Sequence, residues 1–395
     1  MLDLRMSRAI AAGSAALLLL GAAALGTGDA APLVWWVPGG GSTGPTAPGP
    51  APRGRSFDAA TVNAQCESCH RDIATEWRTS LHRQSHTDPM YVAQFAHEPL
   101  PFCTGCHAPE ANPEAPVPPR LSALGVGCVT CHVVGNEVLA AKAAPPAASP
   151  AASPAASSAA SPAASARPAP HAVSRNGVLD GPASCGPCHE FAFPEFVGRK
   201  DPLLMQSTMS EHAASPFAGQ SCASCHMPIV ETRGRKHRSH VFAASRDAAL
   251  VRSAIRIDEK IRAGALVLTL RPDRVGHAFP TGDLLRRLRL VIDVRDGSGA
   301  SVEHFERLFA KRIATSKAPH GAPRKVLAGD SRVGADPADP AGVVVTEFVP
   351  KKRPPGGTIH YTLHYERVAD PSGGPGGTPL VDGAITLADR TIPLP

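Results

Sequence analysis

Large aromatic side chains are scarce in this sequence of 395 residues. Phe, Trp and Tyr together make up 5% of it and only three tyrosines occur, whereas proline and glycine number 41 and 36. A chain of this length normally fills its interior with large apolar side chains. We therefore expect either long irregular segments or a core that is supplied partly by cofactors.

Dense positive charge is also missing. The formal net charge is +6, and basic residues gather only in short clusters such as 233–238. A protein that follows a nucleic acid backbone needs a broader basic surface than this. We therefore expect no nucleic acid partner.

The N-terminus has the pattern of an export signal. Arg5 and Arg8 precede an apolar run over 9–26, and small residues suited to cleavage follow by position 31. Residues 1–31 are thus expected to be a signal peptide or a signal anchor, followed by a Gly/Pro-rich linker over 32–56. The apolar run is a little shorter than the ~20 residues of a spanning helix, so cleavage and anchoring to the inner membrane stay open. Either outcome places the protein in the periplasm.

Cysteine is absent outside one repeated pattern, Cys-x-x-Cys-His. Two thiols at this spacing add to the two vinyl groups of one porphyrin, and the adjacent histidine reaches the iron from one face. We therefore predict five covalently attached haem c groups. The expected attachment residues are Cys66, Cys69, Cys103, Cys106, Cys128, Cys131, Cys185, Cys188, Cys222 and Cys225.

Other uses of cysteine explain this pattern less well. Disulfides are common in exported chains, but they do not require a histidine after every pair. Zinc sites combine Cys and His without repeating the same histidine position five times. A thioredoxin-like site would be a single Cys-x-x-Cys. Haem attachment accounts for all ten cysteines at once.

The five motifs lie within residues 57–248, which we expect to form a pentahaem cytochrome domain. Within it, 141–170 is an Ala/Ser/Pro tract that repeats Ala-Ala-Ser-Pro. Its prolines prevent a long helix and it has nothing to bury, so a disordered insertion is expected. The few residues that remain around five porphyrins imply that the haems form the core, and that the apoprotein does not fold.

The histidine that ends each motif is the expected first axial ligand of its iron. A low-spin electron carrier also needs a second axial ligand, His or Met. Twelve further histidines are available, more than five irons require. The first ligands are His70, His107, His132, His189 and His226.

Four segments resemble multihaem cytochromes related to the tetrahaem cytochrome of ammonia oxidisers and to hydroxylamine oxidoreductase: 66–82, 205–228, 236–245 and 276–283. The first is similar to the signature Cys-x-x-Cys-His-x₃-Tyr-x₂-Trp-x₂-Ser-x-His. It matches at the Trp-x₂-Ser-x-His part, but Ala74 stands at the aromatic position and Ile73 one place before it.

The resemblance implies second axial ligands at His82, His240 and His277, and, through the stretch 170–191, at His171. A helix after the first motif would independently place His82 near a neighbouring porphyrin. The fifth second ligand stays open, because three histidines compete for it: His86, His97 and His212.

His277 lies in a Gly/Pro-punctuated turn, far beyond the last cysteine. The resemblance places this turn at the entry to a C-terminal β-domain. We expect the turn to present His277 to an iron, so that the C-terminal domain docks onto the haem domain through a ligand bond. Four remaining histidines are expected at the surface: His304, His320, His360 and His364.

Residues 249–395 contain no cysteine and change in pattern. Alternating, β-branched segments separated by Gly/Pro turns predict strands at 264–272, 285–296, 342–350, 358–368 and 382–394. Strands of this length suggest a small antiparallel β-sandwich. The expected fold is thus an α plus irregular, haem-packed multihaem cytochrome domain followed by that sandwich.

Closely packed haems held by few residues suit electron transfer. Propionates would bring the charge of the loaded protein to about +1, a nearly neutral surface that suits transient docking of redox proteins as electron donor and acceptor. The alternative is an oxidoreductase acting on a small nitrogen or sulfur compound at one five-coordinate haem. Such enzymes carry a lysine in one motif or a polar pocket, but all five motifs here end in His and no tyrosine lies within them. A structural or sensory role has only the C-terminal domain in its favour.

Overall fold

The computed structural model describes residues 49–51, 54–135, 137–142, 171–175, 177–193, 203–282, 284–316, 324–336, 338–339, 341–371 and 378–394. The predicted signal segment, most of the linker, residues 143–170 of the predicted insertion, and His320 lie outside these residues. Among the helices that are described, none is both long and apolar enough to cross a membrane.

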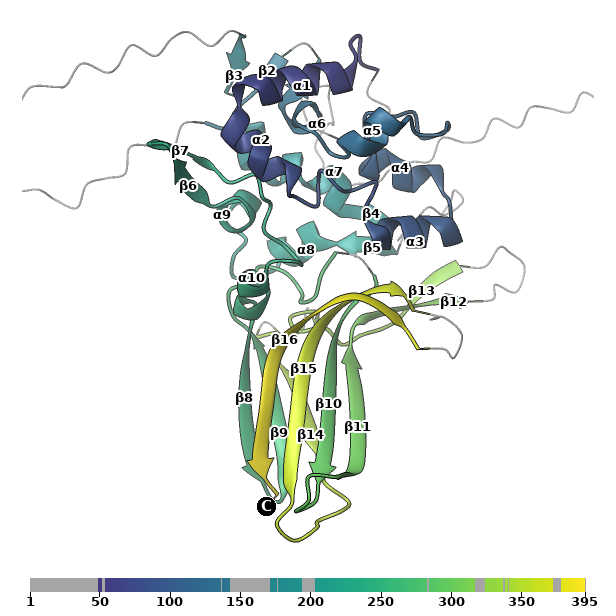
Figure 1. The fold of residues 1–395 in the computed structure, drawn as a ribbon, viewed down its shortest axis with the longest axis vertical. Helices are drawn as coiled ribbons and strands as arrows, with labels where there is room; N and C mark the ends of the chain where they lie inside the picture. Colours follow the sequence, from purple (N-terminus) through teal and green to yellow (C-terminus); the bar gives the residue numbers. More distant parts are fainter. Residues whose placement is uncertain are drawn as a thin grey trace, which may run out of the picture.

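Short helices and small sheets make up the upper part of the molecule in Figure 1. The helices are α1 (Ala59–Cys69), α2 (Arg71–Arg78), α3 (Pro89–His97), α4 (Pro101–His107), α5 (Pro119–Leu124), α6 (Cys128–His132), α7 (Gly186–His189), α8 (Thr208–Ala213), α9 (Cys222–His226) and α10 (Ala248–Ser253), with the 3₁₀ turns Val178–Asp180 and Pro182–Ser184. The strands are β1 (Val133–Val134), β2 (Glu137–Leu139), β3 (Val173–Ser174), β4 (Glu190–Ala192), β5 (Leu204–Ser207), β6 (Ile229–Thr232) and β7 (Arg235–Arg238).

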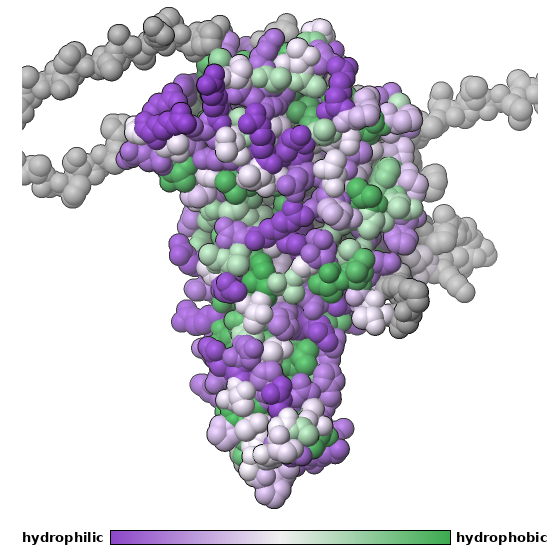
Figure 2. Space-filling view, viewed as in Figure 1, coloured by the Kyte–Doolittle hydropathy of each residue, from purple (hydrophilic) through white to green (hydrophobic). Residues whose placement is uncertain are grey.

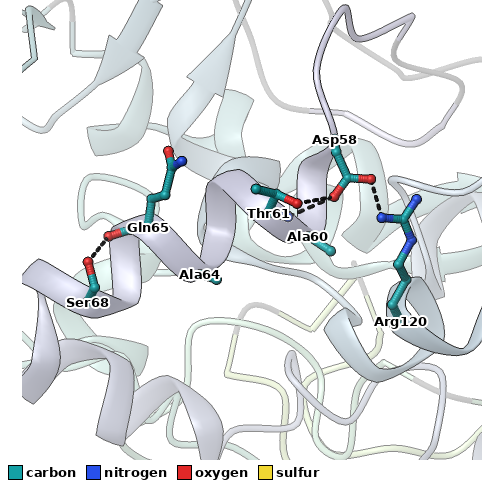
Figure 3. Close-up of a pocket in the computed structure, with 7 residues that line it drawn as sticks. All are labelled: Asp58, Ala60, Thr61, Ala64, Gln65, Ser68 and Arg120. Atoms are coloured by element: carbon teal, nitrogen blue, oxygen red, sulfur yellow. Dashed lines mark hydrogen bonds and ion pairs between the residues drawn. The ribbon is translucent and has the colours of Figure 1, made fainter.

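Local sequence explains where several of these helices begin. Prolines open α3, α4 and α5, where the missing backbone N–H is harmless. Asp58 caps α1 by accepting a 2.8 Å hydrogen bond from the backbone N–H of Thr61. Figure 3 shows this cap and the ion pair from Arg120 to Asp58, 2.5 Å, beside a surface hollow along α1. The hollow is lined by residues of the cap and of the outer α1 face, not by the motif thiols.

A small apolar cluster joins α1, α2, α5 and α6. Its buried members are Ala59, Trp77, Leu124, Val129 and Val133. The cluster is small because short helices contribute few apolar positions each. It nevertheless fixes the helices of the first and third Cys-x-x-Cys-His motifs against each other.

Long antiparallel strands make up the lower part of Figure 1. A four-stranded sheet has the order β11-β10-β15-β16, and a three-stranded sheet has the order β14-β9-β8; β12 and β13 form a separate pair. The strands are β8 (Ile255–Arg262), β9 (Ala265–Pro272), β10 (Arg286–Arg295), β11 (Ser301–Phe309), β12 (Lys311–Ser316), β13 (Arg324–Asp330), β14 (Val344–Phe348), β15 (Thr358–Asp370) and β16 (Leu380–Pro393).

The two larger sheets share the main hydrophobic core. Alternate residues of β9, β10 and β15 are buried in it, as the two-residue period of a strand requires. Leu266, Leu290, Ile292, Ile359 and Leu363 are each no more than 1% exposed. The buried residues of this core lie between Val251 and Ala388, outside the Cys-x-x-Cys-His motifs.

The five predicted strands are confirmed as β9, β10, β14, β15 and β16. Four others were not predicted: β8, β11, β12 and β13. β8 and β11 are edge strands that carry many charged residues, which hide the apolar alternation. At the junction with the helical region, Gln94 of α3 donates to the Ala369 carbonyl of β15, and Arg252 of α10 donates to the Thr386 carbonyl, 3.0 Å.

Candidate haem-ligand sites

Each Cys-x-x-Cys-His motif lies on one helical turn. Motif one lies at the C-terminal end of α1. Motifs two, three and five lie on α4, α6 and α9, and motif four begins just before α7 and extends over it. Residues i, i+3 and i+4 lie on one face of a helix, so both thiols and the histidine can face one porphyrin. None of the ten cysteines, which all lie within the described residues, is in a disulfide bond, which fits covalent attachment to haem.

Thiols of different motifs also approach one another. Cys185 and Cys222, from motifs four and five, are in hydrogen-bonding contact, which lowers the pKa of Cys185 and raises that of Cys222 because two adjoining thiols do not both ionise readily. Burial raises the pKa of Cys128 in motif three to about 12, with a further contribution from Cys66 in motif one. Motifs one and three, and motifs four and five, are therefore neighbours.

Three motif histidines each face a second histidine at nearly the same separation. The ring centroids are 6.1 Å apart for His132 and His240 and for His82 and His189, and 6.3 Å apart for His226 and His277. An imidazole nitrogen binds a metal ion at about 2 Å, so two imidazoles on opposite sides of one ion have centroids about 6 Å apart. The three separations fit an iron between each pair.

Hydrogen bonds at Nδ1 orient most of these rings. An Nδ1–H that donates to a backbone carbonyl leaves Nε2 as the nitrogen able to bind metal. The bonds run from His107 to Ser85 (2.7 Å), His132 to Leu139 (2.9 Å), His226 to Ala243 (2.6 Å), His240 to Arg238 (2.8 Å) and His277 to Ala278 (3.0 Å).

Burial holds most of the paired histidines neutral. Burial, reinforced by neighbouring histidines, lowers the pKa of His82 to about 3 and that of His189 to about 4. Burial also lowers the pKa of His240 to about 4, and it lowers that of His132 and His277. A neutral imidazole keeps the lone pair that a metal ligand must donate.

The Trp-x₂-Ser-x-His pattern has a structural cause. Ser80 Oγ donates to the Trp77 carbonyl at 2.7 Å and accepts from the Arg83 backbone at 3.2 Å, which closes the turn after α2. Trp77 Nε1 donates to the Val126 carbonyl at 2.9 Å, and Val126 N donates to the His82 carbonyl at 2.9 Å. These bonds hold the backbone of His82 in place beside motif four.

His240 is anchored by a residue that the sequence did not single out. Glu76 Oε2 accepts the backbone N–H of His240 at 2.8 Å, and Glu76 Oε1 lies 2.9 Å from His237 Nε2. Glu76 therefore ties the stretch after β7 to α2. An acidic residue in a short helix carries no sequence signal for this role, because most such residues are solvated.

Motif two has a different neighbour, Tyr91. Its ring stacks on His107 with centroids 4.0 Å apart and an interplanar angle of 18°, and the His86 ring lies 5.2 Å from Tyr91. An axial imidazole stands perpendicular to its porphyrin, so a parallel ring at 4.0 Å lies on the same side as His107. Burial raises the pKa of the Tyr91 hydroxyl to about 12. The sequence did not indicate that any tyrosine adjoins a motif.

The other sequence candidates form no such ring pair within the described residues. His70 is exposed between α1 and α2, and His171 is exposed with its Nδ1 3.3 Å from the Ala172 carbonyl. His97 is exposed and lies 3.7 Å from Asp370. His212 lies beside Gly276, next to the His277 turn.

In the β region, His360 and His304 pair with Asp389 and Asp293, each at 2.9 Å, and His364 lies 3.2 Å from Thr386 Oγ1. These carboxylate and hydroxyl partners account for three of the four histidines that were expected at the surface. They show no link to a Cys-x-x-Cys-His motif within the residues described.

Comparisons with known proteins relate this chain to multihaem cytochromes. Residues 65–133 match the family described as cytochrome c554 and c-prime. The fold resembles the crystal structure of a penta-heme cytochrome c552 from Thermochromatium tepidum, with a TM-score of 0.57 and 19% sequence identity; the match covers 84% of this chain and 98% of that one. No curated protein matches the chain in sequence. The chain therefore has a multihaem cytochrome fold.

Proposed function

We propose that this protein is an exported pentahaem c-type cytochrome that carries electrons in a respiratory or periplasmic electron-transfer chain. The observation that carries the proposal is the set of three histidine pairs with centroids 6.1 to 6.3 Å apart. Each pair joins a motif histidine to one from elsewhere in the chain. Haem bound there would supply reversible one-electron chemistry at iron.

In this proposal His82, His240 and His277 are the second ligands opposite His189, His132 and His226. The chain's part is to hold imidazoles rigidly on both sides of each of these three irons. In the His132–His240 and His226–His277 pairs, hydrogen bonds from Nδ1 to backbone carbonyls keep the rings in place when charge changes at the metal. Such sites favour electron transfer over substrate binding, because no coordination position is left open.

The sites also lie close enough together to act as one group. His82 interacts electrostatically with His189, His226, His240 and His107, which belong to the second to fifth motifs or their second ligands. Motif one joins the group through Cys66 beside Cys128. This arrangement supports a continuous series of redox centres across the helical region.

The test is the ferric absorption and electron paramagnetic resonance spectrum of the purified holoprotein, with and without cyanide. Low-spin signals from all five haems, unchanged by cyanide, are the expected result for an electron carrier. A high-spin haem that converts on adding cyanide would contradict the proposal for that site.

The second candidate is an oxidoreductase that acts on a small nitrogen or sulfur compound. The observation in its favour is that Tyr91 and His86 gather beside His107, since such enzymes use polar side chains near an open iron. Because Tyr91 and His86 lie on the His107 side of the porphyrin, they are better placed to hold the His107 ring than to contact a substrate on the opposite side. Cyanide binding confined to one haem, lost in His107→Ala, would favour the enzyme.

For partners, we propose an acidic redox protein that docks on the β6–β7 hairpin. Figure 2 shows strongly hydrophilic residues gathered over this hairpin, and Arg233, Arg235 and Lys236 are exposed on it. Arg238 holds the hairpin to motif five by donating to the Ala223 carbonyl at 3.1 Å, and Arg233 lies 3.6 Å from Asp72 beside motif one. Reversing the charges of Arg235 and Lys236 should slow reduction by an acidic ferredoxin and weaken its salt dependence.

We further propose that the sheets of residues 249–395 form a β-sandwich domain and that the motif region of 57–248 is the haem domain. The shared core of the two larger sheets and the few apolar residues between the motifs support this division. Export to the periplasm rests on the N-terminal pattern and on the location in which haem is joined to such motifs. Fractionation of cells for haem-stained protein would test it.

A further inference from the structure

The turn that carries His277 is held by one carboxylate from the haem region. Glu211 of α8 accepts the backbone N–H of Ala278 at 3.2 Å and the hydroxyl of Thr281 at 2.9 Å, both on Oε2. Ser207 Oγ donates to Oε1 at 2.7 Å. Ala278 directly follows His277 and Thr281 lies three residues further on, so Glu211 fixes the backbone from which this imidazole projects.

The same carboxylate also binds the β region. Arg332 Nη2 lies 2.7 Å from Glu211 Oε1, and the Arg332 guanidinium donates to Asp330 at 2.6 and 2.9 Å. Arg332 Nη1 reaches the Pro280 carbonyl at 3.1 Å. The Glu211 and Arg332 side chains are only 12% and 6% exposed, so water competes weakly for these bonds.

Packing closes the turn on its other sides. Phe279 and Val333 exchange backbone hydrogen bonds of 2.8 and 3.0 Å, which joins the turn to the stretch that carries Arg332. A side-chain carbon at Gly276 would lie 3.0 Å from both His212 and Phe217, so the backbone here contacts the haem region closely. The turn is thus clamped between α8 and the 330–333 segment.

We propose that Glu211 is a positioning residue for His277, and that Glu211 and Arg332 make the second ligand of the fifth haem depend on docking of the β region. This inference rests on the proposed function, in which His277 binds that iron opposite His226. Without the bonds from Glu211 and Arg332, the turn would let His277 move away from the metal. The two-sided clamp makes ligation and domain docking a single event.

The experiment uses the full-length holoprotein and measures carbon monoxide bound per reduced protein, since only an iron that has lost its second ligand binds it. His277→Ala is the reference and should give one additional carbon monoxide-binding haem. Glu211→Ala should give the same single additional haem, and imidazole added to the solution should suppress it. Glu211→Gln keeps one acceptor oxygen and should give an intermediate fraction.

Glu366→Gln is the matched control. Glu366 is a buried carboxylate that lies 2.7 Å from Arg287 and 3.9 Å from Arg289 within the four-stranded sheet. The Glu366→Gln substitution should lower the stability of the β region without removing a ligand from an iron. Thr281→Val removes a single bond to Glu211 and should raise the rate of carbon monoxide binding at the same haem; it serves where Glu211→Ala fails to mature.

The outcomes separate the two ideas. If His277→Ala exposes one haem while Glu211→Ala and Thr281→Val behave like Glu366→Gln, the ligand assignment stands and the positioning role of Glu211 is wrong. If His277→Ala exposes none, the ligand assignment itself is wrong and the inference falls with it. Equal exposure in Glu211→Ala and Glu366→Gln would assign the effect to loss of stability.

Discussion

A single methyl group at Gly125 should disturb two haem sites at once. Gly125 ends α5 with φ +56° and ψ −133°, a backbone conformation that glycine adopts far more easily than other residues. A side-chain carbon there would lie 2.5 Å from the His82 carbonyl oxygen and 2.8 Å from Ser85 Oγ. The His82 backbone carries one proposed ligand, and the Ser85 carbonyl accepts the Nδ1–H of His107.

Two effects set the size of the change for Gly125→Ala. A positive φ with ψ near −133° lies in a sparsely populated backbone region and costs a residue with a side chain about 1 to 3 kcal/mol. Forcing a carbon into contact at 2.5 Å with backbone oxygen adds about 1 to 3 kcal/mol, because the carbonyl cannot turn aside as a flexible side chain would. We therefore expect a loss of about 2 to 6 kcal/mol in the free energy of unfolding, together with movement of 82–85.

Gly135→Ala is the control for this prediction. Gly135 has φ +58°, but nothing lies within 4 Å of the position its side-chain carbon would take. Gly135→Ala therefore carries the cost of a positive φ without the close contact. Denaturant unfolding and ferric resonance spectra of both variants give the comparison. Equal stabilities, with unchanged low-spin signals in Gly125→Ala, would refute the role of close packing in holding His82.

Three further predictions follow from single contacts. The ring planes of His82 and His189 differ by 68°, so the haem between them should give a strongly anisotropic low-spin electron paramagnetic resonance signal. His82→Ala should remove this signal. Loss of an ordinary rhombic signal from His82→Ala would contradict the pairing. Trp77→Phe removes the 2.9 Å bond to a carbonyl and should lower the free energy of unfolding by about 1 to 3 kcal/mol, measured by denaturant titration. Burial tends to raise the pKa of Asp330, but hydrogen bonds and charge from Arg332 outweigh this effect and lower the pKa. Asp330 therefore stabilises the fold above its unfolded pKa and loses this effect as pH falls through its folded pKa, so the difference in unfolding free energy between the wild type and Asp330→Asn should disappear in acid. A difference that does not change with pH would refute the pairing.

Local chemistry made the haem motifs predictable. Two thiols and a histidine at i, i+3 and i+4 face one porphyrin whatever surrounds them, so Cys66, Cys69 and His70 could be interpreted together from the sequence. The turn at Ser80 and His82 is equally local, because its bonds join residues three apart. Strands with clean alternation, such as β10 and β15, were predictable for the same reason.

The choice among surplus histidines depended on packing. His82 and His189 lie far apart in the chain, and only the folded arrangement of α2 and α7 brings their rings to 6.1 Å. By contrast, His171 was named on resemblance, and the structure leaves it exposed. No local pattern distinguishes these two cases, since each is one histidine in a polar stretch.

The residues that hold the proposed ligands were the hardest to anticipate. Glu76, Glu211 and Tyr91 look in sequence like ordinary residues of short helices, and acidic side chains there are usually solvated. Their partners come from distant segments, as with Arg332 on the β region and Glu211 on α8. The sequence by itself determined how many haem motifs the protein has and where each begins, because that chemistry lies within five residues. Only the tertiary structure decided which imidazoles oppose each other and what fixes them, because burial and ion pairing depend on segments that meet in space.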